Sequence, residues 1–320
     1  MLNRLNNLIY KMFSGSSSRE DNEGSNISEV VDFVGVPLLR TEYKALQHIF
    51  AKIVKEKEYR NPAIFYNREI PGMTKMAIED RSVIELDLSS WGGLTSLPQD
   101  IKGLTKLRRL DLSKNPFISF DGIGVLQNLQ YLNISHNELS SVSWGVEELV
   151  SLRVFDASYN ELKSFPGPLV NLRSLRDLDL SANQITSLHG IEGISGLSWL
   201  NVAKNQIEFF PSLSVEVEKL NFNSNHLASL PSSIAKFKNL KELCLSNNRL
   251  TSLPPEIGRL PNLQFLSIDN NNLTKLPYAL TYLPKLKGID FLGNKLDERC
   301  IEILDELKRK GVSVEEPKYG

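Results

Sequence analysis

Motifs for catalysis and metal binding are scarce in this sequence, and so are residues that form disulfide bridges. The chain of 320 residues has 2 cysteines and 4 histidines. The histidines lack the mutual spacing of a metal site or a catalytic triad. The strings G-x-x-x-x-G-K-[ST], H-E-x-x-H and G-x-S-x-G are absent. We therefore expect no enzymatic activity, no cofactor and no bound metal.

Neither sign of charge dominates the composition. The chain has 37 lysines and arginines against 38 aspartates and glutamates, and its formal net charge is −1. Such a balance gives no overall attraction to nucleic acid or to an anionic membrane surface. We therefore expect no nucleic-acid partner.

A pattern of leucine, isoleucine and asparagine instead repeats along most of the chain. It reads L-x-x-L-x-L-x-x-N-x-L and returns at roughly 23-residue intervals, which is typical of a solenoid. Residues 83–94 form a divergent opening copy, with Trp91 where the asparagine belongs. The later copies, between Leu107 and Leu296, each carry the asparagine: Asn115, Asn137, Asn160, Asn183, Asn205, Asn225, Asn248, Asn271 and Asn294.

The spacing within each copy predicts its local structure. Alternating leucines indicate a short strand with one buried face, and successive strands are expected to stack in parallel. Apolar residues three apart, as in Pro254, Ile257 and Leu260, favour a helical or extended turn on the opposite side. The asparagine is expected to satisfy backbone groups of adjacent turns that would otherwise be buried without a partner.

These copies resemble the leucine-rich repeat family over residues 83–296. Copies that contain L-P-x-x-I, within residues 97–107, 230–240 and 253–263, look like its intracellular type, and those at Phe120 and Leu188 are similar to 22-residue repeats of a phosphatase-regulating member. The resemblance implies an α/β solenoid with a curved parallel sheet on its concave face and helical or extended turns on its convex face. It also implies a scaffold for protein recognition, without family catalytic residues.

Secreted members of that family usually close their ends with clustered cysteines. Here Cys244 and Cys300 stand several copies apart, so a reducing compartment is favoured. We expect a cytoplasmic protein, with a translocated effector or a mitochondrial location as alternatives.

Both ends of the repeat array are expected to be capped, because a solenoid must cover its terminal apolar edges. Thr41 is a candidate N-cap of a helix whose apolar stripe is Leu46, Ile49, Phe50, Ile53 and Val54, and Asn61-Pro62 ends it at the latest. A second helix is expected over 297–310, with Ile301, Ile303, Leu304 and Leu307 facing inward and Gly311 as its stop. The expected domains are a disordered tail with a short amphipathic segment (1–28), a helical N-terminal cap (29–82), about ten repeats (83–296) and a C-terminal cap (297–320).

The first 13 residues have apolar side chains at helical spacing together with Arg4 and Lys11. The segment is too short and interrupted for a signal peptide or a membrane span. Three interpretations stay open: weak contact with a membrane surface, a transit peptide, or a frayed end.

Outward side chains of the strands form columns across the expected concave face. One column is markedly acidic and amide-rich, and Arg109, Arg153 and Arg176 lie where they can neutralise its adjacent aspartates. Another contains Tyr131, Trp199 and Phe265, with about 14 Å between successive rings at strand spacing. Large exposed rings are frequent hot spots of protein interfaces. The predicted partner-binding residues are Tyr131, Tyr159, Trp199, Phe265, Asp156, Asp179, Arg176 and Asn201.

The sequence therefore predicts a non-catalytic scaffold or regulatory adaptor that binds a protein or a long peptide by its concave face. We expect a monomer. Two other functions stay open: a secreted bacterial effector that binds a host protein, and a peripheral membrane adaptor held by residues 1–13.

Overall fold

The computed structural model describes residues 30–33, 36–56, 76–90, 92, 94–142, 145–214 and 216–314. The chain divides into two compact units, Met1–Leu152 and Arg153–Gly320. Trp91, Asn61-Pro62 and residues 1–13 lie outside the described residues, and so do the predictions that concern them.

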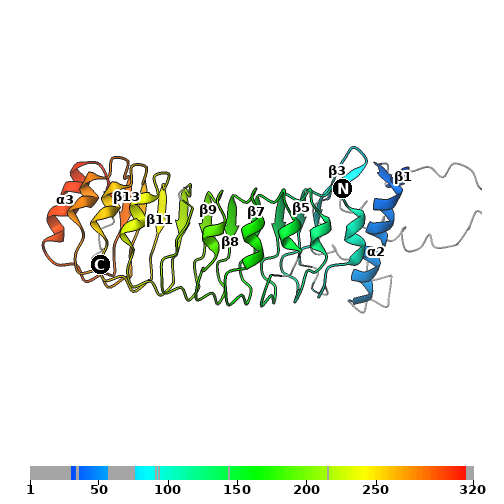
Figure 1. Ribbon diagram of the computed structural model, residues 1–320, viewed down its shortest axis with the longest axis horizontal. Coiled ribbons are helices and arrows are strands. Elements are labelled where there is room, and N and C mark those ends of the chain that lie inside the picture. The colour runs from blue at the N-terminus through cyan, green and yellow to red at the C-terminus, as the bar shows by residue number, and fades with distance from the viewer. Residues whose placement is uncertain are drawn as a thin grey trace, which may run out of the picture. The chain divides into compact units, whose positions relative to one another are not determined.

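In its described residues, the first unit contains two antiparallel strand pairs, a helix and the first repeats (Figure 1). Strands β3 and β4 are antiparallel, whereas β4, β5 and β6 are parallel and in register. The antiparallel strand pairs β1–β2 and β3–β4 were not predicted from the sequence. The elements are β1 (Val30–Phe33), β2 (Val36–Leu39), α2 (Arg40–Glu56), β3 (Met76–Glu79), β4 (Ser82–Asp87), η2 (Gln99–Gly103), β5 (Arg109–Asp111), η3 (Ile123–Val125), β6 (Tyr131–Asn133) and η4 (Val146–Glu148).

Helix α2 covers the first repeat. It begins at Arg40, so Thr41 lies within the helix and is not its N-cap. Leu46 and Ile49 of the predicted stripe are fully buried. The helix packs closely on 3₁₀-helix η2, because a Cβ placed on Gly103 would lie 2.7 Å from the Ala45 Cβ.

A buried glutamate of α2 forms a hydrogen bond with strand β4 of the sheet. Glu42 is 2% exposed, and its Oε2 accepts a hydrogen bond from the Val83 N–H at 2.6 Å. Burial desolvates the carboxylate and raises the pKa of Glu42, and hydrogen bonds from Val83 and Ser82 offset this only in part. The native state thus binds this proton more tightly than the unfolded chain does.

We expect Glu42→Ala to lower the free energy of unfolding by about 2 kcal/mol, because a buried N–H loses its acceptor. Glu42→Gln keeps an acceptor oxygen and should cost less. Ionisation of Glu42 opposes folding, so the stability of the wild type relative to Glu42→Gln should fall as the pH rises from below 4.5 through the folded-state pKa. Urea unfolding of both proteins at about pH 4 and about pH 7.5 measures this, and a stability difference that does not change with pH would refute it.

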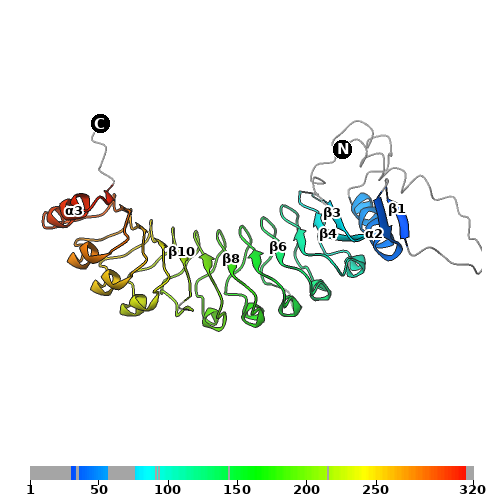
Figure 2. The same cartoon turned by 90° about the horizontal axis from the view of Figure 1, so that it is seen from above.

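In its described residues, the second unit is a stack of seven three-residue strands that ends in a helix and a short strand. Neighbouring strands from β7 to β14 are parallel and in register. The strands line the inner side of this unit and the 3₁₀-helices its outer side (Figure 2). The elements are β7 (Val154–Asp156), η5 (Gly167–Asn171), β8 (Asp177–Asp179), η6 (Ile191–Gly193), β9 (Trp199–Asn201), β10 (Lys219–Asn221), η7 (Ser232–Lys236), β11 (Glu242–Cys244), η8 (Pro255–Arg259), β12 (Phe265–Ser267), η9 (Tyr278–Tyr282), β13 (Gly288–Asp290), α3 (Cys300–Arg309) and β14 (Ser313–Val314).

The repeated asparagines connect successive repeats, as predicted. Asn248 Nδ2 donates to the carbonyl oxygens of Phe222 and Leu245, each at 2.9 Å, and its Oδ1 accepts from the Leu227 N–H at 3.0 Å. Asn205 and Asn225 make the same kinds of bond. These asparagine side chains are buried. They form hydrogen bonds with backbone groups that would otherwise be buried without a partner.

The C-terminal helix differs from the prediction at its start and on one face. It begins at Cys300 because residues 297–299 form a turn, in which the Cys300 N–H donates to the Asp297 carbonyl. Ile303 and Leu307 are buried, but Ile301 is 55% exposed, so its predicted inward orientation is wrong. Gly311, with φ at 80°, ends the helix as expected, and β14 then pairs with β13.

Candidate functional site

The concave face of the second unit is formed by the outward side chains of strands β7 to β13. In each strand the central residue is buried and its two neighbours point to the opposite side, which follows from the two-residue period of a strand. These outward positions carry apolar, charged, amide and small side chains. The structure thus places Trp199, Phe265, Asp156, Asp179 and Asn201 on one surface.

Two aromatic side chains of this face lie on strands β9 and β12. Trp199 is half-buried, whereas Phe265 is 48% exposed. The Phe265 ring leans over the neighbouring strand, because a Cβ on Gly288 would lie 3.3 Å from its Cδ1. Glycine at this position therefore leaves room for the ring to lie against the sheet. Strand spacing separates Trp199 from Phe265 by roughly 14 Å.

The two predicted tyrosines have different surroundings. Tyr159, at the exit of β7, is 46% exposed, and the Lys204 Nζ lies 5.9 Å from its ring centroid. Tyr131 belongs to the first unit, where it is half-buried and the Arg109 Cζ lies 3.5 Å from its ring centroid. Its ring face is thus already occupied by a cation.

The acidic and amide column has a structural use that the sequence did not reveal. Asp156 and Asp179 each accept a hydrogen bond from the backbone N–H two residues later, at 2.9 and 2.8 Å. Asn201 closes its turn in the same way at 3.2 Å, and its Nδ2 donates to Asp179 Oδ2 at 2.9 Å. Short polar side chains commonly close turns in this manner. The column therefore shapes the strand exits in addition to carrying charge.

Two of the arginines expected to neutralise this column make other contacts. Arg176 Nη1 donates to the carbonyl oxygens of Arg173 at 3.2 Å and Leu175 at 2.9 Å. Its guanidinium also occupies the space beside Gly196 that a Cβ would fill. Arg109 lies over the Tyr131 ring. Local backbone acceptors and an aromatic face thus hold these cations, which sequence spacing could not indicate.

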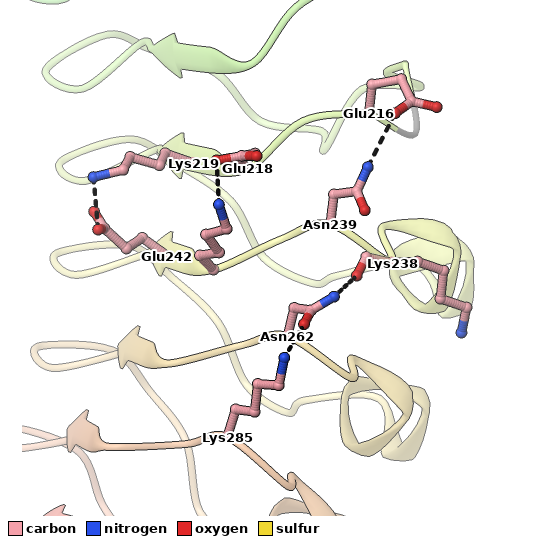
Figure 3. Close-up of polar contacts among 9 residues, drawn as sticks. Glu216, Glu218, Lys219, Lys238, Asn239, Glu242, Asn262 and Lys285 are labelled. Carbon is pink, nitrogen blue, oxygen red and sulfur yellow. Dashed lines mark hydrogen bonds and ion pairs between the residues drawn. The ribbon is translucent and has the colours of Figure 1, made fainter.

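A set of polar contacts joins neighbouring repeats from β10 onward (Figure 3). Lys219 Nζ lies 2.7 Å from Glu242 Oε1 on the next strand, and Lys241 Nζ lies 2.6 Å from Glu218 Oε2. The hydrogen bond to Glu242 raises the pKa of Lys219. Farther from the strands, Asn239 donates to Glu216, and Lys285 donates to Asn262. Among the outward positions of the described strands β7 to β13, Lys219 is the only lysine, and it is directed toward β11.

Asp177 has a different environment from the other acids on the face. It lies on β8 between Val154 of β7 and Trp199 of β9 in the strand register. Its backbone N–H donates to the Arg153 carbonyl, but its side-chain carboxylate makes no hydrogen bond or ion pair with any residue that the structure describes. Burial alone raises the pKa of its carboxyl group. Asp177 is the first residue of its strand, as Trp199 and Phe265 are of theirs, but it was not among the predicted binding residues.

The described residues contain no group of three or more histidine, cysteine, aspartate or glutamate side chains that could hold a metal ion. His48 pairs with Asp100 at 2.9 Å and so connects α2 to η2. Cys244 and Cys300 are both free, and burial raises the pKa of each thiol. No helix within the described ranges is long and apolar enough to cross a membrane.

A further exposed aromatic residue was missed by the sequence analysis. The 20-residue interval between Asn205 and Asn225 has no helical turn between β9 and β10 in its described residues. There Phe210 packs on Phe222, with ring centroids 5.0 Å apart, while Phe209 is 81% exposed. The short interval was visible in the sequence, but which of two adjacent phenylalanines enters the core was not.

Comparison with known proteins agrees with this architecture. The family model described as Leucine Rich repeats (2 copies) matches residues 150–196, 215–257 and 238–280, and that described as Leucine Rich Repeat matches residues 128–148. No curated protein sequence matches significantly. The chain therefore belongs to the leucine-rich repeat proteins.

Solved structures with the same fold come from different kinds of protein. A leucine-rich repeat protein of Leptospira interrogans is 28% identical over 70% of this chain and 64% of its own, with a TM-score of 0.59. A TDR receptor is 32% identical over 67% of this chain and 39% of its own, with a TM-score of 0.60. The plant peptide hormone receptor RGFR1, solved in complex with RGF2, is 26% identical over 68% and 37%, with a TM-score of 0.56. The chain spans less than two thirds of the length of each of them.

Proposed function

We propose that this protein is a non-catalytic recognition module that binds a protein or a long peptide through the concave face of its second unit. The observation that carries the proposal is the position of Trp199 and Phe265 on strands whose other outward residues are mainly polar. Aromatic side chains with accessible apolar area are enriched among interface hot spots.

Three further features support this function. The two aromatic rings are separated by a distance that suits a protein surface or an extended peptide better than a small molecule. The face also lacks a grouping of side chains that could hold a metal within the described residues. A structural neighbour, RGFR1, was solved in complex with RGF2.

We place the protein in a reducing compartment because both of its cysteines are free.

Affinity capture from a native lysate tests the proposal. The double variant Trp199→Ala/Phe265→Ala removes both rings of the concave face. The matched control Tyr278→Ala/Tyr282→Ala removes two rings that are exposed on η9, where they contact each other at 5.8 Å between centroids. We expect the first variant to lose proteins that the wild type and the control both retain, with unchanged melting temperatures. Equal capture by all three proteins would overturn the proposed site.

A further inference from the structure

The concave face of the second unit has an excess of negative charge around Trp199. Its outward strand positions include five acids and one base: Asp156, Asp177, Asp179, Glu242 and Asp290 against Lys219. The base is engaged, because Lys219 pairs with Glu242 on the far side from β8 (Figure 3). The charge left on the face is therefore negative and lies mainly on β7 and β8.

Within this region, Asp177 is the carboxylate whose charge is not compensated locally. Asp179 receives hydrogen bonds on both oxygens, from the Ser181 N–H and from Asn201. Asp177 receives none from the described residues, and Arg176, next to it in the chain, donates to backbone carbonyls instead. Its burial raises the pKa of the carboxyl group, in agreement with an uncompensated loss of hydration.

The neighbour of Asp177 adds a second attraction for a cation. Trp199 lies opposite Asp177 in the parallel register, and adjacent strands are about 4.8 Å apart. A guanidinium group can pair with a carboxylate through its N–H groups and stack on an indole at the same time. An ammonium group lacks this planar geometry.

We propose that the partner presents an arginine to Asp177 and Trp199, next to an apolar side chain that contacts Val154 or Phe265. The partner is thus a basic, partly apolar protein segment. This inference rests on the concave-face function proposed above. Asp177 is then a specificity-determining residue, which lowers the stability of the free protein and is neutralised when the complex forms.

Selection of random 12-residue peptides on the immobilised full chain tests the inference. We expect the wild-type pool to be enriched in arginine by about 5-fold over the unselected library, a contrast of the size expected for one exposed charged contact. Asp177→Lys should abolish this enrichment and favour acidic peptides. Asp290→Asn, which also removes one negative charge from the same face, should leave it unchanged. A wild-type pool that is not enriched in arginine, or that is not enriched in any residue, would overturn the inference.

A synthetic peptide from the wild-type pool allows a sharper comparison. Replacing its arginine by citrulline, which is nearly isosteric but neutral, should weaken binding to the wild type by about 10-fold, the equivalent of about 1.4 kcal/mol. The same replacement should have little effect on binding to Asp177→Asn, as a double-mutant cycle requires for a direct pair. The melting temperature of Asp177→Asn should equal or exceed that of the wild type. Equal citrulline penalties in both proteins would contradict the pairing.

The general proposal and the specific inference can fail separately. If Trp199→Ala/Phe265→Ala selects the same peptides as the wild type, the concave face is not the binding surface. If that variant loses the pool while Asp177→Lys keeps the arginine enrichment, the face binds but Asp177 does not receive the arginine.

Discussion

Replacing Asn248 by alanine is expected to lower the free energy of unfolding by about 4 kcal/mol. The side chain is buried and makes hydrogen bonds to the carbonyls of Phe222 and Leu245 and to the Leu227 N–H. Alanine cannot replace these bonds, and each buried group left without a partner costs about 1 to 3 kcal/mol. Urea unfolding followed by circular dichroism measures the change.

Asn239→Ala is the matched control for that variant. Asn239 also bonds to the preceding repeat, but through its exposed side chain to Glu216 at 3.0 Å (Figure 3). Water can replace this bond, so the expected loss is below about 1 kcal/mol. Similar losses for the two variants would show that the asparagines do not hold the repeats together by buried hydrogen bonds.

Removal of the Trp199 side chain is expected to weaken binding of a captured partner by about 30-fold. The indole supplies the largest side chain among the outward strand positions of the second unit, and truncation of such a hot spot costs about 2 kcal/mol or more. The fold should be little affected, because the core residue of this strand is Leu200 and not Trp199. Titration calorimetry with the purified partner gives the dissociation constants.

The control for this prediction is Tyr282→Ala. Tyr282 is more exposed than Trp199 but lies on η9, on the outer side of the unit. Its removal should change the dissociation constant less than about 2-fold, as expected for a residue outside an interface. A larger effect of Tyr282→Ala than of Trp199→Ala would place the interface on the outer face.

The repeating part of the fold could be predicted because its signals are local and occur many times. Each copy fixes its strand by alternating leucines and its turn by one asparagine, and the hydrogen bonds of Asn248 follow directly from that position. The ends lack this redundancy. The pairing of β3 with β4 and the exposed position of Ile301 depend on tertiary contacts that occur once.

The candidate site was predictable in position but not in its electrostatics. The column that contains Trp199 and Phe265 follows from the repeat register alone. Whether a charged side chain is available to a partner protein depends on its rotamer, which the sequence does not give. Arg176 donates to the Leu175 carbonyl, and Lys219 pairs with Glu242 on β11. The predicted binding residues therefore include Asp179, whose two oxygens already accept hydrogen bonds, and omit Asp177.

Photo-crosslinking from the concave face tests the central claim most directly. A benzoylphenylalanine in place of Phe265 adds a reactive group where an aromatic ring is already exposed, and the same residue in place of Tyr278 does so on the outer side of the unit. After irradiation in native lysate, we expect position 265 to yield a discrete crosslinked protein that Trp199→Ala removes, and position 278 to yield none. A discrete product from position 278 alone would contradict binding by the concave face.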